Sequence, residues 1–182
     1  MESQYSSVQN GGATKIETQV LISSSKFILL CLLTCGLYAL YWQYKAWRFL
    51  KQWQQSDIWP AVRAIFSIFT VYELLKTLQR FANRQSIPAD YRAGNLAAGY
   101  IILSLLSRLP DPFWLISLLA FACLLPAYNV FTTALLVSEE VQAVEQPGFN
   151  TRQWLLIGVF GLFWLLALWG LTLPETEVDI SH

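Results

Sequence analysis

The sequence predicts an all-α integral membrane protein, a helical bundle of four to five transmembrane helices in which one segment is strongly amphipathic. Two observations predict this fold. Charged residues make up only 13% of the 182 residues and hydrophobic residues 55%, whereas a soluble globular domain carries roughly 25% charged residues. The apolar residues also fall into several long runs separated by polar and turn-forming stretches, which is the pattern of successive membrane helices.

The chain divides into three parts. Residues 1–25 are rich in Ser, Gln and Gly and show no sustained periodicity, so they are predicted to form a disordered polar N-terminal tail. Residues 26–173 are predicted to form the helical membrane domain. Residues 174–182 are predicted to form an acidic C-terminal tail.

The first predicted helix spans about 26–44. Its uncharged run 27–42 would extend about 24 Å as a helix. Aromatic and cationic side chains follow, and such residues prefer the headgroup layer of a bilayer. We therefore expect six residues to anchor this helix at the membrane interface: Tyr41, Trp42, Lys45, Trp47, Arg48 and Lys51.

The second predicted segment, about 58–84, is amphipathic. Pro60 suits its first turn, and polar residues recur every three or four positions between Arg63 and Arg84. The opposite side carries apolar residues such as Phe69. The segment could lie flat in the membrane interface, or it could cross the bilayer with its polar stripe turned toward other helices.

The third and fourth predicted segments, about 93–109 and 112–137, are joined by Pro110-Asp111-Pro112. A Pro ends the first helix, Asp can cap the next, and the second Pro fits its first position, so a tight helical hairpin is expected. Small residues in the third segment would let another helix approach closely. Pro126 removes a backbone donor within the fourth segment, so a kink is expected there.

The fifth predicted segment, about 152–173, follows an acidic loop at 138–150. Asn150 or Thr151 can cap its first turn. Trp154 and Trp169 lie near its two ends.

The distribution of Lys and Arg predicts the orientation, because loops rich in these residues stay in the cytoplasm. If the amphipathic segment is interfacial, four helices span and the N-terminal tail lies outside. If it crosses, five helices span and the tail lies inside. Both schemes place 85–94 inside, and both place the turn at 110–112 and the C-terminus outside the cytoplasm, at the bacterial inner membrane.

Residues 34–47, TCGLYALYWQYKAW, resemble the Thr-x-Gly-(Leu/Ile)-Tyr-x-x-Tyr-Trp signature of small bacterial integral membrane proteins that are grouped as a domain of unknown function. PAVRAIF at 60–66 and GLFWLLALWG at 161–170 are similar to other parts of the longer members. The resemblance touches about half of the chain. It implies a bacterial membrane protein with a cytosolic N-terminal region, and it brings no activity or site residue.

Four polar residues in or near the apolar segments are candidates for an intramembrane site: Arg63, Glu73, Asn129 and Thr132. Arg63 and Glu73 are ten residues apart, about three turns on one helix, which is too far for a direct ion pair. They could lie on the wet face of an interfacial helix, or Glu73 could carry a proton or cation. Asn129 and Thr132 could bind a ligand beside Pro126, or hydrogen-bond between helices.

The sequence predicts no enzymatic activity, cofactor or metal site. It contains no nucleophile–base constellation or phosphate-binding Gly loop, and its scattered glycines, such as Gly36, are interpreted as helix-packing positions. Twelve cations balance twelve acids, which argues against nucleic acid as a partner. The expected partners are the lipid bilayer, possible anionic lipids, and a second copy or another membrane protein.

The predicted function is therefore that of a non-enzymatic scaffold or interaction protein of the inner membrane. The alternative is a small transporter or channel that uses Glu73 and the helix kinked at Pro126.

Overall fold

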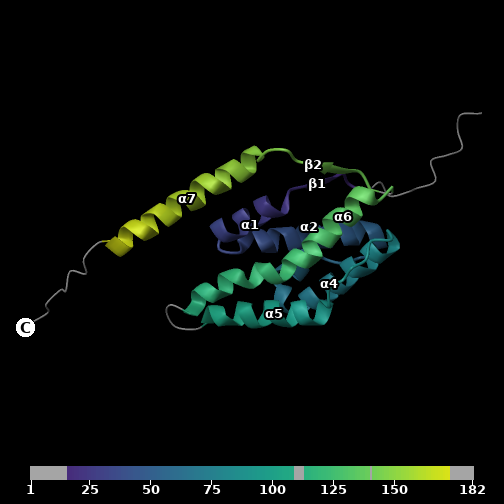
Figure 1. The fold of residues 1–182 in the computed structure, drawn as a ribbon, viewed down its shortest axis with the longest axis horizontal. Coiled ribbons are helices and arrows are strands. Elements are labelled where there is room, and N and C mark those ends of the chain that lie inside the picture. The colour runs from purple at the N-terminus through teal and green to yellow at the C-terminus, as the bar shows by residue number, and fades with distance from the viewer. Residues whose placement is uncertain (1–15, 109–112, 140, 173–182) are drawn as a thin grey trace, which may run out of the picture.

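A computed structural model of the chain describes residues 16–108, 113–139 and 141–172 (Figure 1). The described residues are mostly helical, so the prediction of an all-α architecture is confirmed, with the addition of one two-stranded sheet. The elements are β1 (Gln19–Leu21), α1 (Ser24–Leu33), α2 (Leu37–Gln54), α3 (Pro60–Ile65), α4 (Ser67–Arg84), α5 (Ala93–Leu105), the 3₁₀ helices η1 (Leu106–Arg108) and η2 (Phe113–Leu124), α6 (Leu125–Val137), β2 (Ala143–Glu145) and α7 (Thr151–Thr172).

The first predicted helix is a hairpin of two helices. We expected one helix over 26–44, but the chain reverses between α1 and α2, and the ring of Phe27 lies 5.8 Å from that of Trp42. A continuous helix would separate these residues by about 22 Å. Segment 26–44 therefore does not cross a membrane as a single helix.

The reversal is produced by Thr34, Cys35 and Gly36. Cys35 and Gly36 have φ angles of 51° and 86°, in the left-handed region that Gly adopts without strain. The Thr34 hydroxyl donates to the carbonyl of Leu30 at 2.7 Å and accepts from the amide of Tyr38 at 3.0 Å, so one side chain closes α1 and opens α2. Gly36 is thus a turn residue, not the helix-packing position that we expected.

The amphipathic segment is also broken. It divides at Phe66, where α3 ends and α4 begins with φ −87° and ψ 38°. α3 packs against α2, and α4 packs against α5 and α6. The N-terminal half of this segment turns a group of apolar side chains outward: Trp59, Val62, Ile65, Phe66, Phe69 and Tyr72 are exposed.

The third and fourth segments pack side by side as expected. α5 contacts η2 along its length, and a Cβ added at Gly99 would come within 3.0 Å of the Cys123 sulfur, so the small residue allows the close approach. The predicted turn at Pro110-Asp111-Pro112 lies outside the described residues. Pro126 falls in the first turn of α6, where the winding changes from 3₁₀ to α.

Within the described part of the chain, one helix is long and apolar enough to cross a membrane, the continuous η2–α6 helix at Ile116–Val137. Two further apolar helices, Ser24–Leu33 and Gln153–Leu166, are shorter.

Part of the predicted disordered tail is ordered. β1 pairs in parallel with β2, with Gln19 opposite Ala143, and Glu17 forms an ion pair with Arg48. Residues 1–15 lie outside the described residues. If the chain crosses a membrane, β1 and the acidic loop lie on the same side of it, because the two strands are hydrogen-bonded. This pairing does not fit the four-span scheme, and the α1–α2 reversal fits neither scheme, because both require segment 26–44 to cross as one helix.

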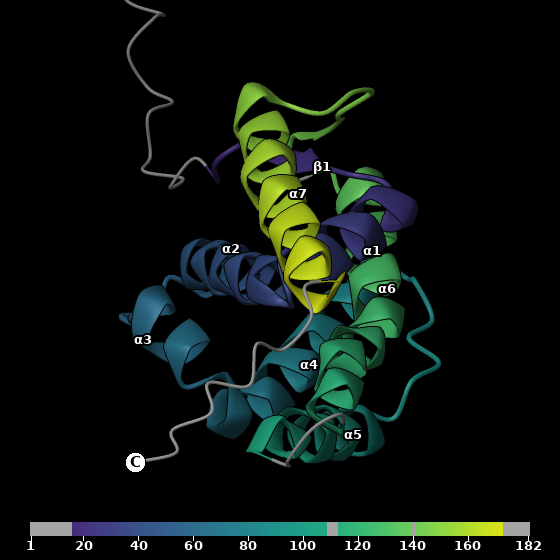
Figure 2. The same ribbon diagram turned by 90° about the vertical axis from the view of Figure 1, so that its left-hand side faces the viewer.

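The core lies between α1, α2, α4 and α6. Its aromatic rings interlock: Phe49 is edge-to-face with both Phe81 and Phe131, and Phe27 stacks on Tyr128 at 4.3 Å. α7 projects along α1 at the edge of this core, and its Leu156 and Ile157 pack against it (Figures 1 and 2). Its Trp164 indole donates to the carbonyl of Leu33 at 3.0 Å, which ties it to the end of α1.

Candidate functional site

The structure pairs two of the four candidate residues. The Arg63 guanidinium lies 2.8 Å from the Glu73 carboxylate, although we expected ten residues of spacing to keep them apart. The break at Phe66 folds α3 back toward α4, and the Thr70 hydroxyl strengthens the bend by donating to the carbonyl of Arg63 at 2.6 Å. Arg63 also lies over the Trp47 ring, 4.5 Å from its centroid.

The other two candidates lie on α6 and face different neighbours. Asn129 accepts a hydrogen bond from the Ser24 hydroxyl at 2.6 Å, so it links α6 to the first turn of α1. Thr132 lines a cavity that is described below. The four residues therefore do not form one site.

The six expected interface anchors divide into two groups. Trp42 and Trp47 are only 7% and 2% exposed and belong to the core, so they pack against protein instead of meeting headgroups. Tyr41 and Arg48 are exposed, and Lys51 lies 3.8 Å from the Asp57 carboxylate. Lys45 is half-buried and points into the cavity.

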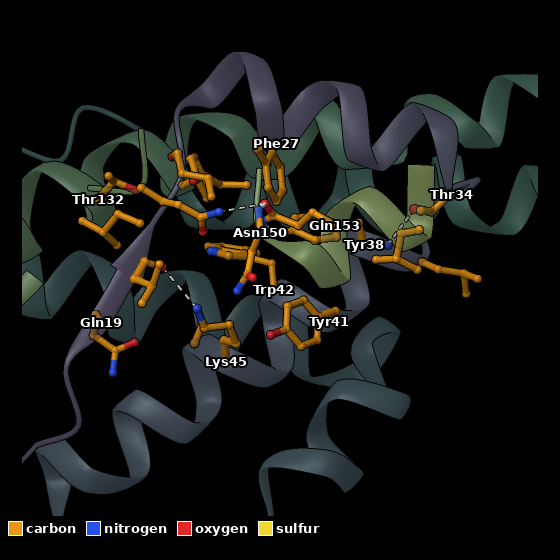
Figure 3. A pocket seen from close by; sticks show the side chains of 18 of the residues that line it. Gln19, Phe27, Thr34, Tyr38, Tyr41, Trp42, Lys45, Thr132, Asn150 and Gln153 are labelled. Carbon is orange, nitrogen blue, oxygen red and sulfur yellow. Dashed lines mark hydrogen bonds between the residues drawn. The ribbon is translucent and has the colours of Figure 1, made fainter. Parts of the chain in front are cut away.

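This cavity, of about 680 Å³, lies between α2 and α7 and is closed by β1, α1, α6 and the loop before α7 (Figure 3). Its volume falls within the range of small-molecule sites, about 300–1,000 Å³. Aliphatic and aromatic side chains make up most of its wall, among them Leu21, Phe27, Leu37, Tyr38, Trp42, Phe131, Leu135, Leu155, Leu156 and Phe160.

One stripe of α2 supplies the floor of the cavity. The lining positions 37, 38, 41, 42, 45 and 46 recur at the spacing of one helix face. α6 contributes in the same way with positions 128, 131, 132 and 135. The helical spacing of these positions can be read from the sequence. However, the aromatic residues of the α2 stripe are also those that a membrane interface favours, so the sequence predicts an interface anchor here and not a cavity.

Hydrogen bonds fix the rim of the cavity at the start of α7. Gln153 accepts from the Asn150 amide at 2.9 Å and from the Gln146 side chain at 3.1 Å, and it donates to the Tyr38 hydroxyl at 3.5 Å. Asn150 in turn accepts from the Thr151 amide at 2.7 Å. Of the two expected capping residues, Asn150 is therefore the one whose side chain accepts a backbone amide at the start of α7, and Gln153 supports it by accepting from the Asn150 amide.

Among the described residues that line the cavity, Lys45 alone carries a charge. Its ammonium donates to the carbonyl of Val20 at 3.2 Å. Burial lowers the pKa of Lys45 below its ordinary value, and the positive charge of Arg48 one turn on lowers it further. Removal of water from this cation favours a compensating acceptor or anion.

A second polar group lies buried between α2, α4 and α5, and its only mark in the sequence is an amide residue within an aromatic run. The Gln43 side chain donates to the Tyr100 hydroxyl at 3.1 Å, which lies 3.2 Å from the Ser67 hydroxyl. The Gln43 carbonyl oxygen has no partner among the described residues. These contacts hold three helices in register, and they offer no nucleophile–base geometry.

The described residues contain no cluster of His, Cys, Asp or Glu that could hold a metal ion. The cavity has the chemistry of a binding site: apolar walls, one cation, and neutral amides and hydroxyls at its rim. No protein-family model, curated protein or solved structure matches this chain.

Proposed function

We propose that this chain is a multi-pass protein of the bacterial inner membrane that acts by interaction, as a scaffold or assembly partner, and that α7 is its interaction element. The observation that carries the proposal is the surface of α7. Apolar side chains over a wide arc of this helix are exposed: Val159, Leu162, Phe163, Leu165, Leu166 and Leu168.

The glycines of α7 support contact with another helix. A Cβ added at Gly158 or Gly161 would meet nothing within 4 Å, so no packing among the described residues requires a small residue at either position. Small residues one turn apart let two helix backbones approach closely in a membrane. A second membrane helix, from another copy of this chain or from a different protein, fits this surface.

The contacts of the cationic residues support an orientation. The Lys26 ammonium donates to the carbonyls of Gln146 and Pro147, and Lys45 donates to β1. These contacts place Lys26 and Lys45 beside the acidic loop. By the positive-inside tendency, this end faces the cytoplasm, and α7 crosses so that the C-terminus lies outside. The resemblance of residues 34–47 to small bacterial membrane proteins stays part of the proposal.

Cysteine cross-linking in native membranes tests the proposal. In a background without Cys31, Cys35 and Cys123, Leu162→Cys and Leu165→Cys flank Gly161 on α7. We expect a disulfide-linked dimer if the partner is a second copy. With a bifunctional thiol reagent, we expect a discrete adduct if it is another protein.

Ile65→Cys is the matched control, because Ile65 is an equally exposed apolar residue on a different surface. It should give neither product. A protein that stays monomeric in mild detergent and forms no adduct from any α7 position would contradict the proposal.

The alternative, a small transporter or channel, has one observation in its favour: Thr132, on the helix that contains Pro126, lines the cavity. Glu73 does not line it, and its carboxylate is paired with Arg63. If Glu73 carries a proton or ion, Glu73→Gln should abolish flux in proteoliposomes. Absence of flux in the unaltered protein would end this alternative.

A further inference from the structure

We propose that the cavity between α2 and α7 binds an anionic amphiphile, a molecule with a single acyl chain and a carboxylate or phosphate head. The head pairs with Lys45, and the chain lies between the apolar side chains of α2 and α7. This site is separate from the outward surface of α7 and does not depend on what that surface contacts.

The walls of the cavity select an apolar chain. Leu37 and Trp42 face it from α2, and Leu156 and Phe160 face it from successive turns of α7. Burial of apolar surface against such walls stabilises a bound chain by about 25 cal/mol per Å² of area removed from water. A nucleotide or sugar would find few partners here, because its many hydroxyls would face hydrocarbon.

The single cation selects the sign of the head. Lys45 is the one charged lining group among the described residues, and no carboxylate of the described chain lines the cavity to neutralise it. Its one hydrogen bond within the described residues is to a neutral carbonyl at 3.2 Å, which leaves further ammonium protons to donate. The Tyr41 hydroxyl, one turn before Lys45 on the same face of α2, also lines the cavity (Figure 3).

The polar and apolar groups are ordered along the cavity. Lys45 lies eight residues, about 12 Å, beyond Leu37 on α2. α7 runs beside the α1–α2 turn, because Gln153 contacts Tyr38 and Trp164 contacts Leu33. Phe160, one turn before Trp164, therefore lies toward the apolar end near the turn. This order matches a head at Lys45 and a tail directed toward the turn.

Photolabelling of the purified full chain in a non-ionic detergent tests the proposal. The probe is a fatty acid with a diazirine in its tail, and the readout is the labelled fraction and the labelled residues by mass spectrometry. We expect labelling to concentrate on Leu156, Phe160 and their neighbours across the cavity. Labelling spread evenly over the exposed face of α7, at Leu162 and Leu165, would overturn the proposal.

Competitors with one alkyl chain and different heads test the charge. A fatty acid and a lysophosphatidic acid should both displace the probe, and their relative potency tells whether a free fatty acid or a phospholipid-derived molecule is the better ligand. The matching alcohol should compete about tenfold more weakly, because it lacks a charge-assisted hydrogen bond. The matching amine should not compete. Equal competition by acid, alcohol and amine would overturn the proposal.

Two variants separate binding from folding. Lys45→Met removes the charge at similar length and should reduce labelling about tenfold. Lys51→Met is the control, because Lys51 is on the same helix but does not line the cavity, and it should label normally. Leu156→Trp fills the cavity and should block labelling while the unfolding temperature is maintained. Full labelling of both Lys45→Met and Leu156→Trp would overturn the proposal.

Discussion

Helices α2 and α7 are similar in length and both rich in aromatic residues, yet they have opposite environments. α7 is the more apolar by sequence, and most of its large side chains are exposed. α2 contains Lys45, Arg48 and Lys51, and its aromatic face is buried in the core. The more apolar of the two helices is thus the less covered, which reverses the order found in a soluble protein.

The difference teaches what drives packing in this chain. In a protein that spans a membrane, as we propose for this chain, an apolar side chain gains little by leaving the lipid, so helices associate through close packing and hydrogen bonds. α2 offers interlocking rings and the buried Gln43–Tyr100 contact. α7 offers leucines and open glycines, which suit lipid or another helix. Shape and turn chemistry, more than hydropathy, decide which helix is enclosed.

The largest effect that would sharpen this comparison is a matched pair of Phe→Ala substitutions. Phe49 on α2 is 1% exposed and contacts the rings of Phe81 and Phe131, whereas Phe163 on α7 is 54% exposed. Phe49→Ala should lower the free energy of unfolding by about 3–5 kcal/mol, and Phe163→Ala should change it by much less. Equilibrium unfolding in detergent measures both. Equal losses would show that α7 is packed as tightly as α2.

The next effect concerns two glycines that both have open space around them. Gly36 has φ +86° in the turn before α2, and Gly158 lies inside α7. Gly36→Ala should cost about 1–2 kcal/mol, because an L-residue is strained in the left-handed region. In detergent that keeps the chain monomeric, Gly158→Ala should be neutral or stabilise α7 by about 0.5–1 kcal/mol, because Ala favours the helix. Thermal unfolding of the two variants measures both effects. A loss of stability in the Gly158→Ala variant would contradict the open space around Gly158.

The same two helices show what the sequence could predict. Apolar length was enough to locate α7 and the packed pair α5–η2, and the Gly99 contact follows from small-residue spacing. Three features of the fold could not be predicted from the sequence. The Thr34–Gly36 reversal occurs inside an unbroken apolar run, the bend at Phe66 has no Pro or Gly to mark it, and β1 pairs with a strand more than a hundred residues away.

The candidate site, like the fold, could be predicted from the sequence only in part. The sequence predicts Arg63 and Glu73 as candidate polar residues but places them too far apart to pair, and their ion pair depends on the bend at Phe66. The cavity depends on where α7 lies relative to α2, and this placement is set by long-range contacts such as Trp164 to Leu33. Local periodicity carries no information about such contacts.

A smaller effect tests how α7 is attached. The Asn150 side chain accepts from the Thr151 amide at the start of α7, and the Gln153 side chain accepts from the Asn150 amide. Asn150→Ala should cost about 1 kcal/mol and speed amide exchange in the first turn of α7, while exchange in α2 stays unchanged. Thr151→Ala is the control, because the Thr151 side chain is exposed at the adjacent position. Equal effects of the two substitutions would show that the first turn is held by something other than this cap.

The smallest effect concerns the ion pair on the outer side of α2. Glu73 is 59% exposed at its side chain, so solvent screens its attraction to Arg63, and a double-mutant cycle with Arg63→Gln and Glu73→Gln should give a coupling of about 0.2–1 kcal/mol. Arg63→Gln alone should cost more than Glu73→Gln alone, because it also removes the contact with the Trp47 ring. The cycle is measured by equilibrium unfolding at low and high salt, and the coupling should fall as salt increases. A coupling well above this range that salt does not change would mean that the pair is shielded from water, and α3 would then belong with the enclosed face of α2 instead of the exposed surface of the molecule.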